Sequence, residues 1–350
     1  MDLSLAAILP AIVSNPILIV IIIMSMGVCV VNGATVSAAL VATTIATRSI
    51  SPKKAIILAV VCDFAGIIIM SYFSTAVAGT ILNMVDFGGD NHQALVALMA
   101  AMVAIIVWSI VAWAFKIPSS QSHALIAGLT GAAVALQMGF GGVNWAVWMR
   151  VIYGLVVSLG LGFGLGWLST KILGRLCRNL DHRKVQGKFR VAQIVTAGTL
   201  VFMHGSQDGQ KFMAICLLGI VFALGGSPGD FSSFPLWLMI LSGASLAIGT
   251  ACFGSRIIKS VGMDMVKLER WQGFAATLSS TISIFVSTIT GLPISVTHAN
   301  TTAVMGVGSA KRLSAVKWGK AKNMVLTWIF TFPGCGIIAF GLVFLFEIFL

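Results

Sequence analysis

Long runs of apolar residues, separated by short polar segments, fill this chain. They cover residues 3–47, 55–82, 94–116, 119–140 and 144–171, and then 192–225, 234–254, 272–292, 295–310 and 323–350. Most are as long as the roughly 20 residues that an α-helix needs to cross a bilayer. The pattern predicts an all-α polytopic membrane protein. The first run of each half is interrupted, near Asn32 and at His204, and the runs 119–140 and 295–310 begin with proline and hydroxyl residues, so we expect broken or re-entrant helices.

The composition agrees with a membrane protein. Of 350 residues, 58% are hydrophobic and only 9% are charged, against about 25% charged residues in soluble domains, which excludes a water-soluble enzyme. The net charge of +12 comes from Lys and Arg in short segments between helices, where the positive-inside rule explains it. The expected partner is therefore the lipid bilayer and not nucleic acid. The six cysteines form no close pairs and predict neither a disulfide nor a metal site.

Several motifs recur at nearly constant spacing. The segment from Pro118 to His123 returns as Pro293 to His298, 175 positions later, and Asn32-Gly33 is echoed by His204-Gly205 at an offset of 172. These matches predict a duplicated unit with a first repeat in 1–170, a cytoplasmic basic linker in 171–191 and a second repeat in 192–350.

Matching loops of the two halves carry opposite charge. Lys53-Lys54 follows Ser51-Pro52, whereas Gly229-Asp230 follows Ser227-Pro228. Placing basic loops in the cytoplasm puts matching loops on opposite sides of the cell membrane and both termini outside. Two inverted-topology repeats meeting at a midplane site are typical of secondary transporters.

The repeated Pro-x-Ser-x-Ser/Thr-His motif is the strongest chemical signal. Proline followed by hydroxyl residues is typical of a helix start, whose free N–H groups bind anions. If the two starts converge, they offer a cage for a tetrahedral oxyanion. The candidate substrate-binding residues are Ser120, Gln121, Ser122, Ser295, Val296 and Thr297, with His123 and His298 as supports. The alternative is that each hydroxyl only caps its own helix.

A second polar motif runs from His204 to Lys211 inside an apolar segment. An ionised side chain at the membrane centre is costly, so Asp208 should face a cavity, a cation or a partner. Either Asp208 pairs with Lys211 one turn away, or Gly205 and Gly209 break the helix and free carbonyls for a cation. Asp63 is another acid within an apolar run.

The run from His204 to Lys211 resembles the His-Gly-x-Asn-Asp-x-Gln-Lys signature of the inorganic phosphate transporter (PiT) family, and the paired proline motifs are of that family's type. The resemblance extends over nearly the whole chain. It implies import of inorganic phosphate by symport with sodium or protons, with Asn32 and His204 supporting the substrate site and Asp208, Gln207, Thr35 and Asp63 as cation-binding candidates. Sodium, if used, would lie at Asp208.

The first-half signature departs from that family's pattern. The usual Asn-Gly-x-His/Asn-Asp-x-x-Asn reads here as Asn32 to Ala39, so that Val36 replaces the carboxylate and Ala39 the amide. The usual Asn of the second half is Gln207, and Thr277 replaces an acid or amide. These changes predict fewer sodium ions, or a proton in place of one, and they make sulfate or another oxyanion the rival substrate.

Other functions fit the sequence less well. An intramembrane enzyme would use Ser120 or Ser295 with His123 or His298, but no acid is placed to orient either histidine. A channel is disfavoured because a duplicated cage and broken helices suit alternating access. No cofactor is expected beyond the coupling ion, and the sequence leaves open whether the protein forms a homodimer.

Overall fold

A computed structural model of the protein describes residues 3–88, 90–114, 120–179, 181–227, 229, 233–261 and 267–349. These residues are almost entirely helical, which confirms the all-α fold. The helices are α1 (Leu5–Ser14), α2 (Pro16–Asn32), the π-helical turn η1 (Gly33–Ser37), α3 (Ala38–Ala46), α4 (Pro52–Phe73), α5 (Ala76–Leu82), α6 (Asn91–Ala114), α7 (Gln121–Leu136), η2 (Phe140–Gly142), α8 (Trp145–Leu176), α9 (His182–Ala223), α10 (Leu236–Val261), α11 (Arg270–Ile289), α12 (Val296–Lys311), η3 (Leu313–Ala315) and α13 (Trp318–Phe349).

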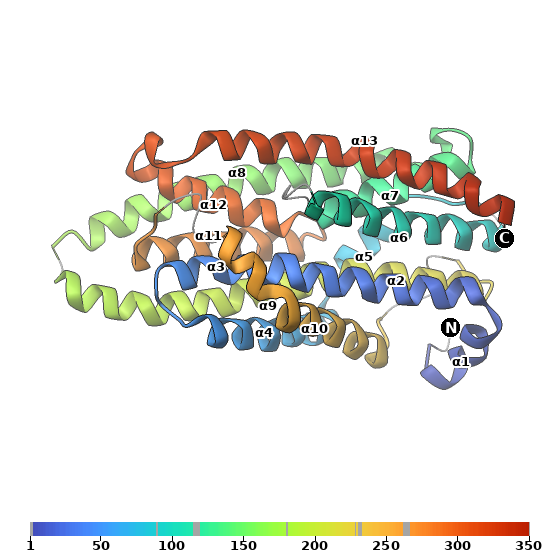
Figure 1. Ribbon diagram of the computed structural model, residues 1–350, viewed down its shortest axis with the longest axis horizontal. Helices are drawn as coiled ribbons and strands as arrows, with labels where there is room; N and C mark the ends of the chain where they lie inside the picture. The colour runs from blue at the N-terminus through green and yellow to red at the C-terminus, as the bar shows by residue number, and fades with distance from the viewer. Residues whose placement is uncertain are drawn as a thin grey trace.

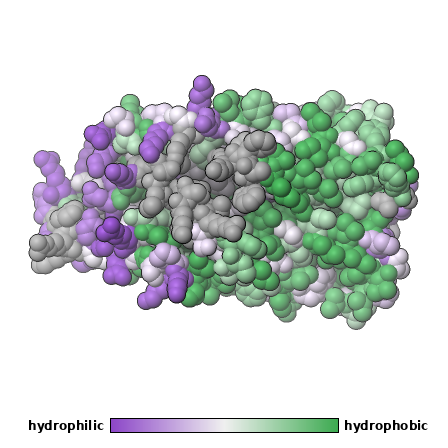
Figure 2. Space-filling view, viewed as in Figure 1, coloured by the Kyte–Doolittle hydropathy of each residue, from purple (hydrophilic) through white to green (hydrophobic). Residues whose placement is uncertain are grey.

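Six helical segments in the described part of the chain are long and apolar enough to cross a membrane. They are Pro16–Ala46, Pro52–Phe73, Asn91–Ala112, Trp145–Leu176, Leu236–Ser255 and Ala321–Phe349. Many large apolar side chains remain exposed on them. In Figure 2 hydrophobic residues cover the molecule from its middle to its right end, and hydrophilic residues gather at the left end. The protein is therefore a multi-pass membrane protein.

Helices α7 and α12 are too short to span the membrane and begin inside the protein. Each has 16 residues, or about 24 Å at 1.5 Å per residue, which is less than the roughly 30 Å of the hydrocarbon core. Their N-caps, Ser120 and Ser295, are each 1% exposed. From there α7 runs towards the right end of Figure 1 and α12 towards the left. This is the arrangement that the proline motifs predict, although Pro118 and Ser119 lie outside the described residues.

The two halves of the chain interlock. Helix α7 packs against α13 of the other half, and α12 packs against α8; likewise α4 packs against α9, and α10 against α2 and η1. Each of these contacts has a counterpart in which the halves exchange roles. The basic stretch 171–191 was expected to be a linker, but most of it is helical, because α8 continues to Leu176 and α9 begins at His182. The repeat boundary itself stays a prediction.

Glycines allow the closest of these contacts. A Cβ on Gly205 of α9 would overlap the carbonyl of Asp63 on α4, and one on Gly33 would overlap the carbonyl of Leu246 on α10. Neither position therefore admits a side chain without moving a backbone. The same relation recurs 175 residues apart, where Gly131 meets the Gly336 carbonyl and Gly306 the Phe163 carbonyl.

Basic segments gather at one end of the molecule. The connections from α3 to α4, from α8 to α9 and from α12 to α13 lie at the left end of Figure 1, whereas α1 and the end of α13 lie at the right. The left end, where these connections lie, is also the hydrophilic end in Figure 2. The placement of this end in the cytoplasm stays a prediction, and Pro228 and Asp230, which contributed to it, lie outside the described residues.

Candidate functional site

The starts of α7 and α12 contact each other directly. Ser120 donates from Oγ to the Oγ of Ser295 over 2.8 Å, although 175 residues separate them. Each hydroxyl also caps its own helix, because Ser120 accepts from the backbone N of His123 at 3.3 Å and Ser295 from that of His298 at 3.4 Å. The hydroxyls therefore cap their own helices and also bring the two helix starts together, while anion binding at this place stays a prediction. Two positive helix ends point at one buried place.

The histidines of the two motifs form a buried aromatic pair. The ring centroids of His123 and His298 are 4.3 Å apart at an interplanar angle of 84°. Trp328 lies against His298 and Phe332 against His123, with centroid distances of 3.5 Å and 4.8 Å. None of the four ring nitrogens has a hydrogen-bond partner of good geometry in the described part of the chain. Buried polar atoms are rarely left so, and these can accept or donate to a ligand.

The other motif residues offer less through their side chains. The Oε1 of Gln121 accepts from Ser109 on α6 at 3.1 Å, and Val296 belongs to an apolar cluster. Both stand in the first turn of a helix, so their contribution to an anion site would come from backbone N–H groups. Thr297 is partly buried on α12. Ser122 differs from these three, because its hydroxyl faces the second motif.

Lys211 connects the two motifs. Its Nζ donates to the Oγ of Ser122 at 2.8 Å and to the carbonyl of Ile294, just before α12, at 2.6 Å. The same Nζ lies 2.7 Å from the Oδ1 of Asp208. Lys211 is fully buried. A positive charge thus stands between the helix starts and the carboxylate of Asp208.

His204 joins two carboxylates. Its Nδ1 lies 2.8 Å from the Oδ1 of Asp63 on α4, and its Nε2 lies 3.3 Å from the Oδ2 of Asp208. The Nδ2 of Asn32 donates to the same Oδ2 of Asp208 at 2.9 Å. Because both ring nitrogens face acceptors, a doubly protonated imidazole satisfies both carboxylates. In that form the two negative charges of Asp63 and Asp208 are balanced by the positive charges of His204 and Lys211.

One interpretation of the sequence expected a break in the helix at this motif, but α9 is not broken there. It runs without interruption from His182 to Ala223, so the carbonyls near Gly205 and Gly209 stay within the helix. The two glycines instead let α4 approach, since a Cβ on Gly209 would overlap the side chain of Ile67. The break near Asn32 is present, as the π-helical turn η1. Such turns are frequent at functional sites.

Asp208 is paired with Lys211, as one of the two interpretations of the sequence expected, so the alternative of an unpaired carboxylate beside freed carbonyls is wrong. Of the other cation-binding candidates, Asp63 contacts His204 and so belongs to the cluster of Asp63, His204, Asp208 and Lys211. Thr35 and Gln207 form hydrogen bonds elsewhere. The Oγ1 of Thr35 donates to the carbonyl of Val31 at 2.7 Å, and the Nε2 of Gln207 donates to the carbonyl of Leu292 at 3.0 Å. Val36 is buried among apolar residues. Of Asn32, Thr35 and Val36 in the first-half signature, only Asn32 therefore contacts the Asp208 carboxylate.

Three contributors could not be recognised from the sequence. The carbonyl of Ile294 accepts from both Lys211 and Ser122, a backbone role that an apolar side chain conceals. Ser37 lies in η1 with its Oγ 3.4 Å from the Nδ1 of His204. Trp328 packs on His298 from the far end of the chain. The only sequence signal was that Ile294 directly precedes a helix start.

Comparisons with known proteins identify the family to which the chain is similar. A profile described as the phosphate transporter family matches residues 32–339. A probable low-affinity inorganic phosphate transporter of Bacillus subtilis (strain 168) is 34% identical over 90% of this chain and 92% of its own length. A protein of the same description from Rhizobium meliloti (strain 1021) is 35% identical over 93% and 95%.

The fold also matches a solved structure. A structure described as the sodium-dependent phosphate transporter superposes with a TM-score of 0.88 and 22% identity, covering 96% of this chain and 100% of that one. At that identity the likeness concerns the fold alone. The relatives are transporters, so the intramembrane enzyme considered as an alternative for the Ser and His residues is set aside.

Proposed function

Because the chain belongs to the phosphate transporter family, we propose that it imports inorganic phosphate by symport with a cation, and that this cation is a proton. The observation that carries the proposal is the meeting of two helix starts, Ser120 and Ser295, beside the buried amine of Lys211. Helix dipoles, hydroxyls and a cation are the groups that stabilise a buried oxyanion.

The substrate would replace bonds that the protein now makes with itself. Phosphate oxygens accept hydrogen bonds, so they can take the place of the Ser120–Ser295 bond and of the Ile294 carbonyl at Lys211. The unpartnered ring nitrogens of His123 and His298 are further donors when protonated on the side that faces the ligand. The side chains of Ser120, Ser295 and Lys211 are buried in this structure, which fits an occluded step of alternating access.

Lys211 couples the anion to the second cluster. When its amine turns from Asp208 to phosphate, the carboxylate loses its ion pair in a medium where an unpaired charge is costly. An additional proton taken up by Asp208, on the Oδ1 that Lys211 has left, removes that cost. Phosphate and proton then bind with mutual assistance, which is the linkage that symport requires.

The cluster suits a proton better than the sodium site that the sequence suggested. His204 faces Asp63 from α4 and Asp208 from its own helix, with Asn32 and Ser37 from α2 and η1 alongside. Both titratable carboxylates are therefore bound to an imidazole, and Lys211 holds the second oxygen of Asp208. A membrane potential of 100 mV opposes the entry of an anion by roughly 2.3 kcal/mol per charge, and accompanying cations offset this cost.

Uptake of radiolabelled phosphate into proteoliposomes tests the proposal. We expect accumulation when an inward proton gradient is imposed without sodium, collapse of that accumulation with a protonophore, and no competition from excess sulfate. A sodium gradient at equal pH should drive little uptake. Accumulation that follows sodium alone would overturn the proton assignment, and uptake of sulfate in preference to phosphate would overturn the substrate. A Ser120→Ala/Ser295→Ala variant provides the matched control for background uptake.

A further inference from the structure

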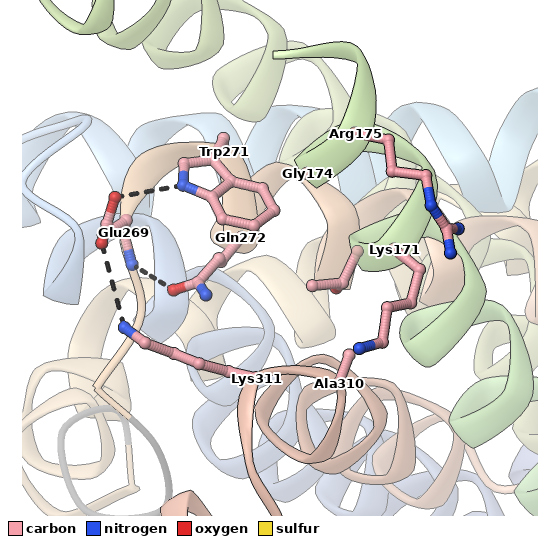
Figure 3. Close-up of a pocket in the computed structure, with 9 residues that line it drawn as sticks. Lys171, Gly174, Arg175, Glu269, Trp271, Gln272, Ala310 and Lys311 are labelled. Carbon is pink, nitrogen blue, oxygen red and sulfur yellow. Dashed lines mark hydrogen bonds and ion pairs between the residues drawn. The ribbon is translucent and has the colours of Figure 1, made fainter. Parts of the chain in front are cut away.

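A recess lined mostly by polar residues lies away from the phosphate site, at the basic end of the molecule. It has a volume of about 400 Å³ and lies where the ends of α8 and α12 meet the start of α11. Figure 3 shows Lys171 and Arg175 of α8 on one side of it, with Trp271 and Lys311 across the recess. Neither the proposed transport site nor the coupling cluster includes any of these residues.

The recess carries excess positive charge. Lys171, Arg175 and Lys311 line it together with one carboxylate, that of Glu269. In the described part of the chain no carboxylate pairs with Lys171 or Arg175. The recess is therefore a place where an anion is attracted and not yet matched by the protein.

Glu269 does not cancel this attraction, because it offsets only one of the three positive charges, and its oxygens are also bound by neighbouring side chains. Its Oε2 accepts from the Nε1 of Trp271 at 3.0 Å and from the Nε2 of Gln186 at 3.4 Å. The Oε1 lies 4.0 Å from the Nζ of Lys311, a long and exposed pair that contributes little. The carboxylate also caps α11, in a capping box with Gln272. It positions Trp271 at the recess, and among the described residues both α8 cations remain without a carboxylate partner.

The outer side of α8 gives the recess a boundary with the membrane. The Nζ of Lys171 lies 5.7 Å from the centre of the Trp167 ring, one turn deeper along the helix. Trp167, Leu168 and Ile172 are exposed apolar side chains on the same stretch. Aromatic residues beside cations are typical of the level of lipid headgroups. An occupant with a phosphate at Lys171 and Arg175 can therefore extend apolar chains along α8.

From these features we infer that the recess binds the phosphate group of an anionic phospholipid, whose acyl chains lie on the exposed face of α8. The shared chemistry is a phosphate, which free inorganic phosphate also offers. The apolar side chains next to the cations favour the lipid, because a free ion would gain nothing from them. Arg175 can hold two phosphate oxygens with its planar guanidinium, and Lys171 adds a point charge.

Lipid binding by the purified full-length protein tests this inference. The protein in a neutral detergent would be titrated with phosphatidylglycerol, phosphatidylcholine and inorganic phosphate in separate arms, with bound lipid counted by native mass spectrometry. The test variant is Lys171→Gln/Arg175→Gln. The matched control is Lys53→Gln/Lys54→Gln, which removes two exposed charges from the start of α4 at the same end of the molecule.

We expect phosphatidylglycerol to bind in preference to phosphatidylcholine, and the test variant to lose about tenfold or more in affinity while the control keeps it. Both double variants should elute and melt as the unaltered protein, since no carboxylate of the described residues pairs with any of the four side chains and none of them is fully buried. Equal losses in the two variants would show general charge attraction and overturn the site. The contrary result is that inorganic phosphate at millimolar concentration displaces the lipid from the unaltered protein and binds to it, but not to the test variant. That result would assign the recess to the free ion and overturn the lipid assignment.

Discussion

The amine of Lys211 lies 2.7 Å from the Oδ1 of Asp208, one turn earlier on α9. Both side chains are buried, so the pair is removed from water. A buried pair is weak evidence for stability, but removal of one partner leaves an uncompensated charge that costs about 3 to 5 kcal/mol. The relationship therefore makes the two residues depend on each other whatever their role in transport.

This dependence can be measured by melting temperature. We expect Asp208→Asn and Lys211→Gln each to lower the thermal stability of the purified protein, because each leaves the other charge unpaired. The double variant should recover much of the loss, since no net charge then remains between the two positions. Losses that simply add in the double variant would contradict a functional ion pair at this place.

The paired hydroxyls at the helix starts should determine phosphate affinity. Ser120→Ala and Ser295→Ala each remove a hydrogen bond to a charged ligand worth about 1.5 to 3 kcal/mol, so the KM for phosphate should rise about tenfold to a hundredfold. Ser14, whose hydroxyl is exposed and bonds only the carbonyl of Ala11, provides the control as Ser14→Ala. Uptake kinetics in which all three variants behave alike would exclude the helix starts as the site.

Gly205 should tolerate no side chain, in contrast to Gly164. An added Cβ at Gly205 would overlap the Asp63 carbonyl, whereas at Gly164 it meets nothing within 4 Å. Alanine is the better helix former by roughly 1 kcal/mol, so Gly164→Ala should keep or raise the melting temperature. Gly205→Ala should lower it, by an overpacking cost of about 1 to 3 kcal/mol. Equal melting temperatures would contradict the close approach of α4 and α9.

The sequence predicted the convergence of α7 and α12 because the evidence for it is local and occurs twice. A proline, a capping hydroxyl and a histidine specify a helix start wherever they stand. The Ser120–Ser295 contact then follows once both starts are placed inside the protein. The sequence also offered the Asp208–Lys211 pair as one of two alternatives for Asp208. That evidence is local as well, because the spacing of the two residues fits one turn of an unbroken helix.

Contacts that depend on distant segments could not be predicted in this way. Asp63 and His204 are 141 residues apart, and neither carries a sign of the other. The glycines of α9 were ambiguous, because glycine both weakens a helix and lets another backbone approach. Which role applies depends on what lies opposite, here the carbonyl of Asp63. The sequence contains the residue but not its neighbour.

The orientation of the protein can be tested at two exposed positions. Arg312 follows α12 at the basic end, and Asp86 lies at the opposite end, where its carbonyl accepts from Gln137 just after α7. In a variant without the native cysteines, Arg312→Cys should react with a membrane-impermeant thiol reagent only from the cytoplasmic side and Asp86→Cys only from outside. Labelling of both from one side would contradict the predicted topology.

Asp208 should be essential for coupling and less so for movement of phosphate itself. In Asp208→Asn the site keeps the hydroxyls of Ser120 and Ser295, and the amide can still accept from Lys211, but it can no longer take up a proton. We therefore expect loss of accumulation driven by a proton gradient, with part of the exchange of internal for external phosphate retained. Because this variant also leaves the charge of Lys211 unpaired, its melting temperature should be measured beside its uptake, to separate a loss of folding from a loss of coupling.

The matched comparison for coupling is Asp63→Asn, which changes the other carboxylate on His204. If the proton is shared over the whole cluster, this variant should weaken accumulation without abolishing it, because His204 and Asp208 remain 3.3 Å apart. Radiolabelled uptake at several external pH values, with exchange measured in the same vesicles, distinguishes the two. An Asp208→Asn protein that concentrates phosphate normally while Asp63→Asn does not would place the coupling site at Asp63 and contradict the role given to Lys211.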